Sequence, residues 1–64
     1  MTHTTTVTVS ILQKGSALVA EIDAAAAARA KHPGRHVEAV RWLSAAPFDS
    51  SLGGRWVELE VDLA

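Results

Sequence analysis

The histidines are the side chains of this sequence best suited to chemistry near neutral pH, because an unperturbed imidazole titrates there. His32 and His36 lie four residues apart, but a Pro-Gly pair between them breaks any helix, so the spacing does not place both rings on one face. A metal ion would need a further ligand from another element, with His3, Glu38 or Asp49 as possible donors. We therefore expect solvated loop histidines and no metal site.

Serine and glycine patterns give no stronger sign of catalysis. No serine lies in the G-x-S-x-G turn that exposes a nucleophile at the end of a strand. Lys14-Gly15-Ser16 could offer main-chain N–H groups to a phosphate at a helix start, but the segment lacks the spacing of a P-loop. Ser16 is therefore expected to cap a helix. The sequence predicts a protein that is not an enzyme and carries no cofactor.

A basic stretch in the middle of the chain could contact nucleic acid. Arg29, Lys31, Arg35 and Arg41 are accompanied there by a single acid, Glu38. However, the whole chain has a net charge of −1, and the stretch has no aromatic side chain on which a base could stack. The plainer interpretation is a helix end whose cations complement the helix dipole, followed by a solvated turn. Nucleic-acid binding stays as an alternative.

Two tryptophans are the strongest sign of a binding surface. Tryptophan is enriched at the buried centres of interfaces, and two rings on neighbouring strands could also stack on a flat cofactor such as flavin. Ordinary packing of one or both rings in the core is the structural alternative. The residues expected to contact a partner are Val37, Arg41, Trp42, Trp56 and Glu58.

The composition limits the class of protein. A chain of 64 residues forms one small domain, and it contains no cysteine, so it lacks the disulfides that small secreted domains commonly use. No apolar run is long enough to span a bilayer, and the opening residues lack the pattern of a signal peptide. We expect a single cytoplasmic domain over residues 1–64 that does not enter a membrane, with residues 1–4 as a flexible N-terminus.

Two segments in the first half of the chain have clear periodicity. Val7, Val9 and Ile11 alternate with threonine and serine between Thr4 and Leu12, which predicts a strand with one face on a core. A helix is expected from about Ala17 to Lys31, where a His-Pro-Gly sequence ends it. Its large apolar side chains are confined to its first half. The stripe expected to face the core consists of Leu18, Val19, Ile22 and Ala25 or Ala26.

The second half of the chain predicts two strands around a loop. Residues 35–44 have apolar side chains on both faces, and a helix is the alternative because Val37, Val40 and Ser44 also fall at helical spacing. Phe48 and Leu52 are expected to anchor the loop. In the last strand, the residues expected to face the core are Val57, Leu59, Val61 and Leu63. Those expected on its opposite face are Trp56, Glu58, Glu60 and Asp62.

These elements predict an α+β fold, a small β-α-β-β domain with one helix packed on a three-stranded, mostly antiparallel sheet. The helix can cover only one face, and the other would carry Trp56 with one set of apolar residues from the second strand. Such a face is typical of a surface that another subunit or a partner covers. The expected function is a small homo-oligomeric protein-interaction module, such as a regulator, an adaptor or an inhibitor encoded by a mobile element.

The order of elements resembles one known family, the dodecins. The resemblance lies in a first strand, a helix that opens on Gly15-Ser16, and two longer strands with Trp42 on the first of them. Dodecins are small flavin-storing proteins that assemble as hollow dodecamers, so the resemblance implies a homo-oligomer and a dodecin-like carrier of a flat cofactor as the second hypothesis. It covers most of the chain, although the aromatic residue that opens the helix of that family is absent here.

Overall fold

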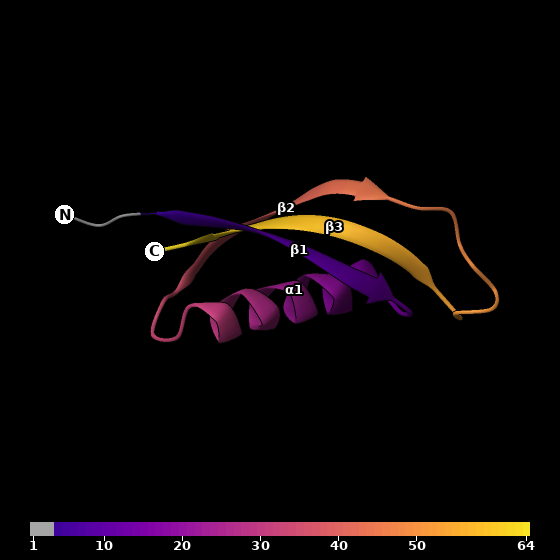
Figure 1. The fold of residues 1–64 in the computed structure, drawn as a ribbon, viewed down its shortest axis with the longest axis horizontal. Coiled ribbons are helices and arrows are strands. Elements are labelled where there is room, and N and C mark those ends of the chain that lie inside the picture. The colour runs from indigo at the N-terminus through magenta and orange to yellow at the C-terminus, as the bar shows by residue number, and fades with distance from the viewer. Residues whose placement is uncertain (1–3) are drawn as a thin grey trace.

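Four elements follow one another in the predicted order (Figure 1). A computed structural model describes residues 4–64, so the possible role of His3 and the expected flexibility of the first three residues lie outside the described part of the chain. The elements are strand β1 (Thr5–Gln13), helix α1 (Ala17–Lys31), strand β2 (Val37–Ala45) and strand β3 (Arg55–Leu63). The segment with apolar residues on both faces is therefore a strand and not a helix.

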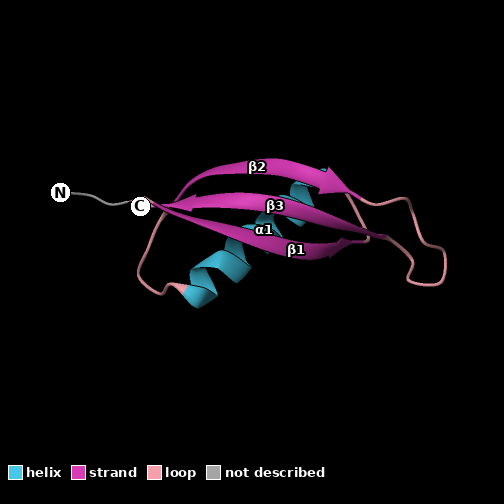
Figure 2. Cartoon of the chain, turned by 45° about the horizontal axis from the view of Figure 1, so that its top comes forward, coloured by secondary structure: helices cyan, strands magenta, loops and turns pink. Residues whose placement is uncertain are grey.

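The three strands form one antiparallel sheet with the order β1-β3-β2. The last strand is therefore the central one, and β1 and β2 are the two edges. The helix α1 covers a single face of the sheet (Figure 1) and crosses behind it diagonally (Figure 2). It packs mainly against β1 and β3 and less against β2. The predicted fold class is confirmed.

The core lies between α1 and the central strand. Val57, Leu59, Val61 and Leu63 are at most 1% exposed, and they are the largest fully buried side chains in the described residues. On β1, Val7 and Val9 are buried beside them, as the alternation of that strand predicts. Because two strands alternate without interruption, the buried and open faces of β1 and β3 follow directly from sequence parity.

The face that α1 buries differs from the predicted one. The buried helical residues are Ala20, Ala24 and Ala28, which recur every fourth position. The expected stripe lies outside the core, since Leu18, Val19 and Ile22 are 66%, 50% and 56% exposed. Methyl side chains let a helix backbone approach a sheet closely, whereas a row of leucine-sized side chains would keep the helix farther from the sheet. The prediction that Leu18, Val19 and Ile22 face the core is therefore wrong.

The ends of α1 follow the predicted chemistry. Ser16 caps the first turn, because its Oγ accepts a hydrogen bond of 3.3 Å from the N–H of Val19. At the other end, the N–H of His32 donates to the carbonyl of Ala28, and Gly34 turns the chain with a φ of +84°. The turn sends the chain back into the sheet as β2.

Two irregularities in β2 explain its apolar residues on both faces. The pairing with β3 shifts by one residue between Val37 and Ala39 and again between Trp42 and Ser44. Directly paired side chains lie on the same face of a sheet. Val37, Val40 and Trp42 pair with buried residues of β3 and therefore lie on the helix side, whereas Ala39 and Arg41 pair with acidic residues on the other side.

The loop between β2 and β3 is held by its main chain and not by the predicted apolar anchors. Phe48 and Leu52 are 60% and 39% exposed. Asp49 organises the turn instead, because its Oδ1 accepts hydrogen bonds from the hydroxyl and the N–H of Ser51, and these bonds lower the pKa of its carboxyl group. Gly54 ends the loop against the carbonyl of Gln13, where a Cβ would clash with that oxygen. The anchoring prediction is wrong.

The alanine face of α1 gives a direct test of this packing. Ala24→Leu should destabilise the protein by about 1–3 kcal/mol, because the larger side chain must push the helix away from β3. Ala26→Leu adds the same atoms at an exposed position of the same helix and should change stability little. Urea unfolding of both variants checks this. Equal stability of the two would mean that another face of the helix is buried.

Candidate functional site

The sheet has one uncovered surface, the face opposite α1, which we name the open face (Figure 2). Its residues follow from the strand register. From β1 they are Thr6, Thr8, Ser10 and Leu12; from β3, Trp56, Glu58, Glu60 and Asp62; and from β2, Ala39, Arg41 and Ser44. The predicted division of the last strand into a buried and an opposite face is confirmed.

Trp56 is the large apolar feature of the open face. Its side chain is about half exposed (51%), and its direct partner across the sheet is Leu12. It lines a shallow pocket of about 400 Å³, which is the volume of a small ligand site or of a groove for one or two partner side chains. The pocket is lined by Ser10, Ser44, Ala46, Trp56, Val57 and Glu58.

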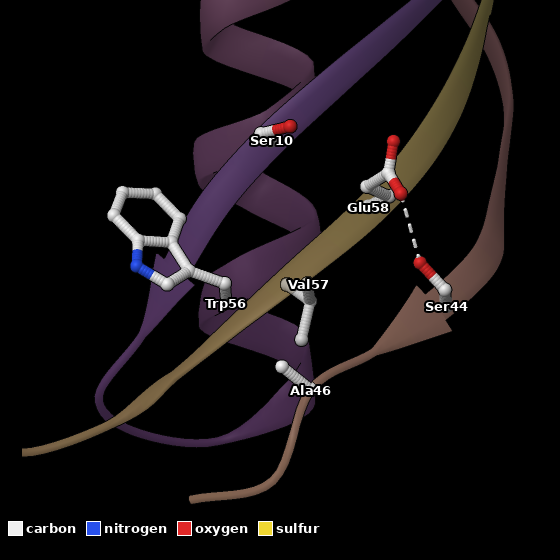
Figure 3. A pocket seen from close by; sticks show the side chains of 6 residues that line it. All are labelled: Ser10, Ser44, Ala46, Trp56, Val57 and Glu58. Carbon is white, nitrogen blue, oxygen red and sulfur yellow. Dashed lines mark hydrogen bonds between the residues drawn. The ribbon is translucent and has the colours of Figure 1, made fainter. Parts of the chain in front are cut away.

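Trp56 and the acid of the pocket lie on opposite sides of β3 (Figure 3). The indole lies on the β1 side of β3, whereas the carboxylate of Glu58 lies toward β2. There Glu58 accepts a hydrogen bond of 3.0 Å from the hydroxyl of Ser44. The pocket therefore combines a flat aromatic surface with a carboxylate. The hydrogen-bond partner of this carboxylate is the neutral hydroxyl of Ser44.

Arg41 ties the three strands together on the open face. Its guanidinium lies 2.7 Å from Glu60 and 2.7 Å from Asp62, and the hydroxyl of Thr6 on β1 donates to Asp62 at 2.8 Å. The hydrogen bond from Arg41, followed by that from Thr6, lowers the pKa of Asp62 to about 2. The two carboxylates in turn raise the pKa of Arg41. The charge of Arg41 is thus largely matched within its own sheet.

The structure separates the residues expected to bind a partner. Arg41, Trp56 and Glu58 share the open face, but Trp42 and Val37 lie on the helix side. Trp42 is still 39% exposed, because α1 packs less against β2 than against the other strands. The two tryptophans therefore point to opposite sides of one sheet, and a single chain does not bring them together around one flat ligand.

The basic residues are also dispersed. Arg29 and Lys31 are exposed at the end of α1, as expected. Arg35, however, is partly buried and binds the end of β3: its Nε donates to the carbonyl of Ala64 (2.8 Å) and its Nη2 to the carbonyl of Leu63 (3.0 Å). The prediction that Arg35 is solvated is wrong, because a guanidinium that satisfies carbonyls at a strand end has a structural role. No single basic surface unites these side chains with Arg41.

The sequence patterns do not predict several residues of the site. Ser10 and Ser44 line the pocket and Leu12 pairs with Trp56, but none of the three is among the residues expected to contact a partner. Strand parity would have identified the two residues of β1, whereas the register shift in β2 hides Ser44. Among residues 4–64, no three His, Cys, Asp or Glu side chains are grouped closely enough to hold a metal ion. Within the same residues, α1 is not long and apolar enough to cross a membrane.

The fold and the site define a small α+β domain that exposes a tryptophan on an uncovered antiparallel sheet. No family model, curated protein or solved structure matches the chain.

The ion pair between Asp62 and Arg41 predicts how stability depends on pH. Folding lowers the pKa of Asp62, so the stabilisation is complete above about pH 4, the ordinary value of the group, and is lost as the pH falls through about 2. Asp62→Asn should be less stable than the parent at pH 7, and this difference should shrink between about pH 4 and pH 2. Urea unfolding at a series of pH values measures it. A difference that stays constant over this range would contradict the ion pair.

A second prediction concerns the arginine at the strand end. Arg35→Gln should lower the free energy of unfolding by about 1.5–3 kcal/mol, because carbonyls bound by a charged donor lose their partner. Arg29→Gln removes the same charge from an exposed position and should stay within about 0.5 kcal/mol of the parent. Thermal unfolding compares the two variants, and equal melting temperatures would exclude a structural role for Arg35.

Proposed function

We propose that this protein is a small homo-oligomeric protein-interaction module that binds through its open face around Trp56. The observation that carries the proposal is the half-exposed indole on a face where Arg41, Glu60 and Asp62 are already paired with one another. A water-exposed tryptophan is unfavourable in a monomer, but it is a common centre of a protein interface, where a partner removes it from water.

The distribution of other apolar side chains supports an interaction function. β1 and β2 finish at the same end of the molecule at which α1 and β3 begin (Figure 1), and we name this the loop end. Eight large apolar side chains at 39–66% exposure belong to the segments that meet there: Leu18, Val19, Ile22, Trp42, Leu43, Phe48, Leu52 and Trp56. These side chains lie on both sides of the sheet, because Trp42 is on the helix side and Trp56 on the open face, so they make the loop end apolar without forming one continuous surface.

The immediate surroundings of Trp56 suit a protein partner. Ser10, Ser44 and Glu58 form a polar border beside an aromatic centre, which is the usual arrangement of an interface core and its rim. The pocket is open and shallow enough to receive side chains from a second surface. These features favour a macromolecular partner over an enclosed small molecule.

The two alternative functions have less support. A dodecin-like carrier of flavin would have to assemble its aromatic site from more than one chain, because Trp42 and Trp56 lie on opposite faces. Nucleic-acid binding would rely on Arg29 and Lys31, since Arg35 and Arg41 are engaged within the fold. A yellow purified protein would favour the first alternative, and binding that weakens steeply with salt would favour the second.

Removal of the exposed indole tests the proposal. Trp56→Ala should keep the secondary structure and weaken self-association about 30-fold, equal to about 2 kcal/mol, as for the loss of a central interface aromatic. Sedimentation velocity over a concentration series measures the shift toward smaller species. Phe48→Ala, which truncates an exposed aromatic in the loop, is the matched control and should have the smaller effect. A parent protein that is monomeric at millimolar concentration would overturn the proposal.

A further inference from the structure

The main-chain groups of β1 divide into two sets. On β3, the carbonyl of Trp56 accepts a hydrogen bond from the N–H of Ala46, the residue after β2. Ala64, the residue after β3, exchanges two hydrogen bonds with His36, the residue before β2. The even-numbered residues of β3 therefore bond toward β2, and the odd-numbered ones bond toward β1. Their partners on β1 are the odd-numbered residues Thr5, Val7, Val9 and Ile11.

The other set of β1 residues faces the free edge of the sheet. By the alternation of an antiparallel ladder, Thr6, Thr8, Ser10 and Leu12 direct their N–H and C=O groups away from β3, in the plane of the sheet. No hydrogen bond found for residues 4–64 outside the strand ladders uses the main chain of these four residues. The helix lies in a separate layer behind the sheet, so it leaves this edge open within the plane.

The two edges of the sheet differ in their protection against pairing. Folded proteins commonly guard an edge strand with charges, proline or bulges. β2 has two register shifts and carries Glu38 and Arg41. β1 pairs regularly with β3 over nine residues, and it contains no charge, proline or glycine. β1 is thus the edge that can accept another strand.

We propose that β1 pairs antiparallel with β1 of a second copy of this chain, which extends the sheet to six strands. A strand without charges places no like charges opposite each other when it meets its own copy, whereas self-pairing of β2 brings two copies of Arg41 together. The antiparallel arrangement is also closed by a two-fold axis. A β1-to-β2 contact between copies would instead be head-to-tail, and it closes only if the rotation between successive copies completes a ring.

The register of this pair follows from the lengths and faces of the strands. With the two-fold axis near Val9, all nine residues of each β1 find a partner, and both helices lie on the same face of the joined sheet. Thr8 then lies opposite Ser10 of the other copy, and Thr6 opposite Leu12. These are the residues whose main-chain groups face the edge, so the pair forms about eight inter-chain hydrogen bonds.

This edge is distinct from the open face, and the inference rests on the proposed function only in that both require self-association. Amide hydrogen exchange on the parent protein separates the two. Where the oligomer predominates, the amides of Thr6, Thr8, Ser10 and Leu12 should exchange at least about 100-fold more slowly than in an unstructured chain, and dilution should abolish this protection. Fast exchange in an intact oligomer would overturn the β1 contact and leave the open-face proposal standing. A monomeric parent would overturn both.

A substitution at the edge tests the same contact. Thr8→Pro removes an N–H that β3 does not use, at an exposed position where the fixed φ of proline suits an edge strand, so the fold should persist. It should abolish the β1 pair, whereas Thr8→Val keeps the N–H and should assemble as the parent does. An assembly of Thr8→Pro equal to that of Thr8→Val would overturn the inference. If Thr8→Pro does not fold, the exchange experiment decides.

The double variant completes the design. Thr8→Pro alone should leave the species joined by the open face, and Trp56→Ala alone should leave the pair joined by β1. Thr8→Pro with Trp56→Ala should be monomeric in sedimentation at concentrations where each single variant still associates. A double variant that assembles as Trp56→Ala does would show that β1 contributes nothing, and would overturn the β1 contact.

Discussion

The contact of an alanine helix face with the central strand is the constraint on which the rest of this structure depends. Ala24 and Ala28 have no exposed surface, and they lie in the same core cluster as Leu59 and Leu63. Because the close approach of helix and sheet needs methyl-sized groups, the larger apolar side chains of α1 cannot share that face. They are consequently displaced to the surface, and the apolar character of the loop end follows from how the core is packed.

The open face is organised by a different principle, the mutual satisfaction of its charges. Arg41 binds two carboxylates of β3, one of which also binds Thr6 on β1, so a polar network crosses all three strands. Such a network lets an uncovered sheet face water without unpaired groups. Trp56 has no part in this network. Its position beside a satisfied polar surface, and not its hydrophobicity alone, is the reason for proposing it as a contact residue.

The sequence predicts some elements well because their residue patterns are compatible with a single arrangement of buried and exposed side chains. The alternation in β1 and β3 fixes which side chains are buried, and Ser16 begins the helix where its hydroxyl can cap it. The helical face was mispredicted because leucine and isoleucine outrank alanine on any hydrophobic scale, whereas the close packing of this core selects small side chains. The two bulges of β2 break strand parity, so the separation of Trp42 from Trp56 appears only in three dimensions. The role of Arg35 was hidden because its partners are carbonyls distant in sequence.

Folding and association are expected to be coupled in a chain of this size. A domain of this size buries only about 60% of the surface that its unfolded chain exposes, less than larger domains do. The large fully buried side chains of the described residues all come from one strand. A contact that forms only in the folded state stabilises that state by mass action. If association shields Trp56 or the free edge of β1, the melting temperature must rise with protein concentration. The surfaces that a monomer leaves unfavourably exposed would then be the same surfaces that supply the stability its small core lacks.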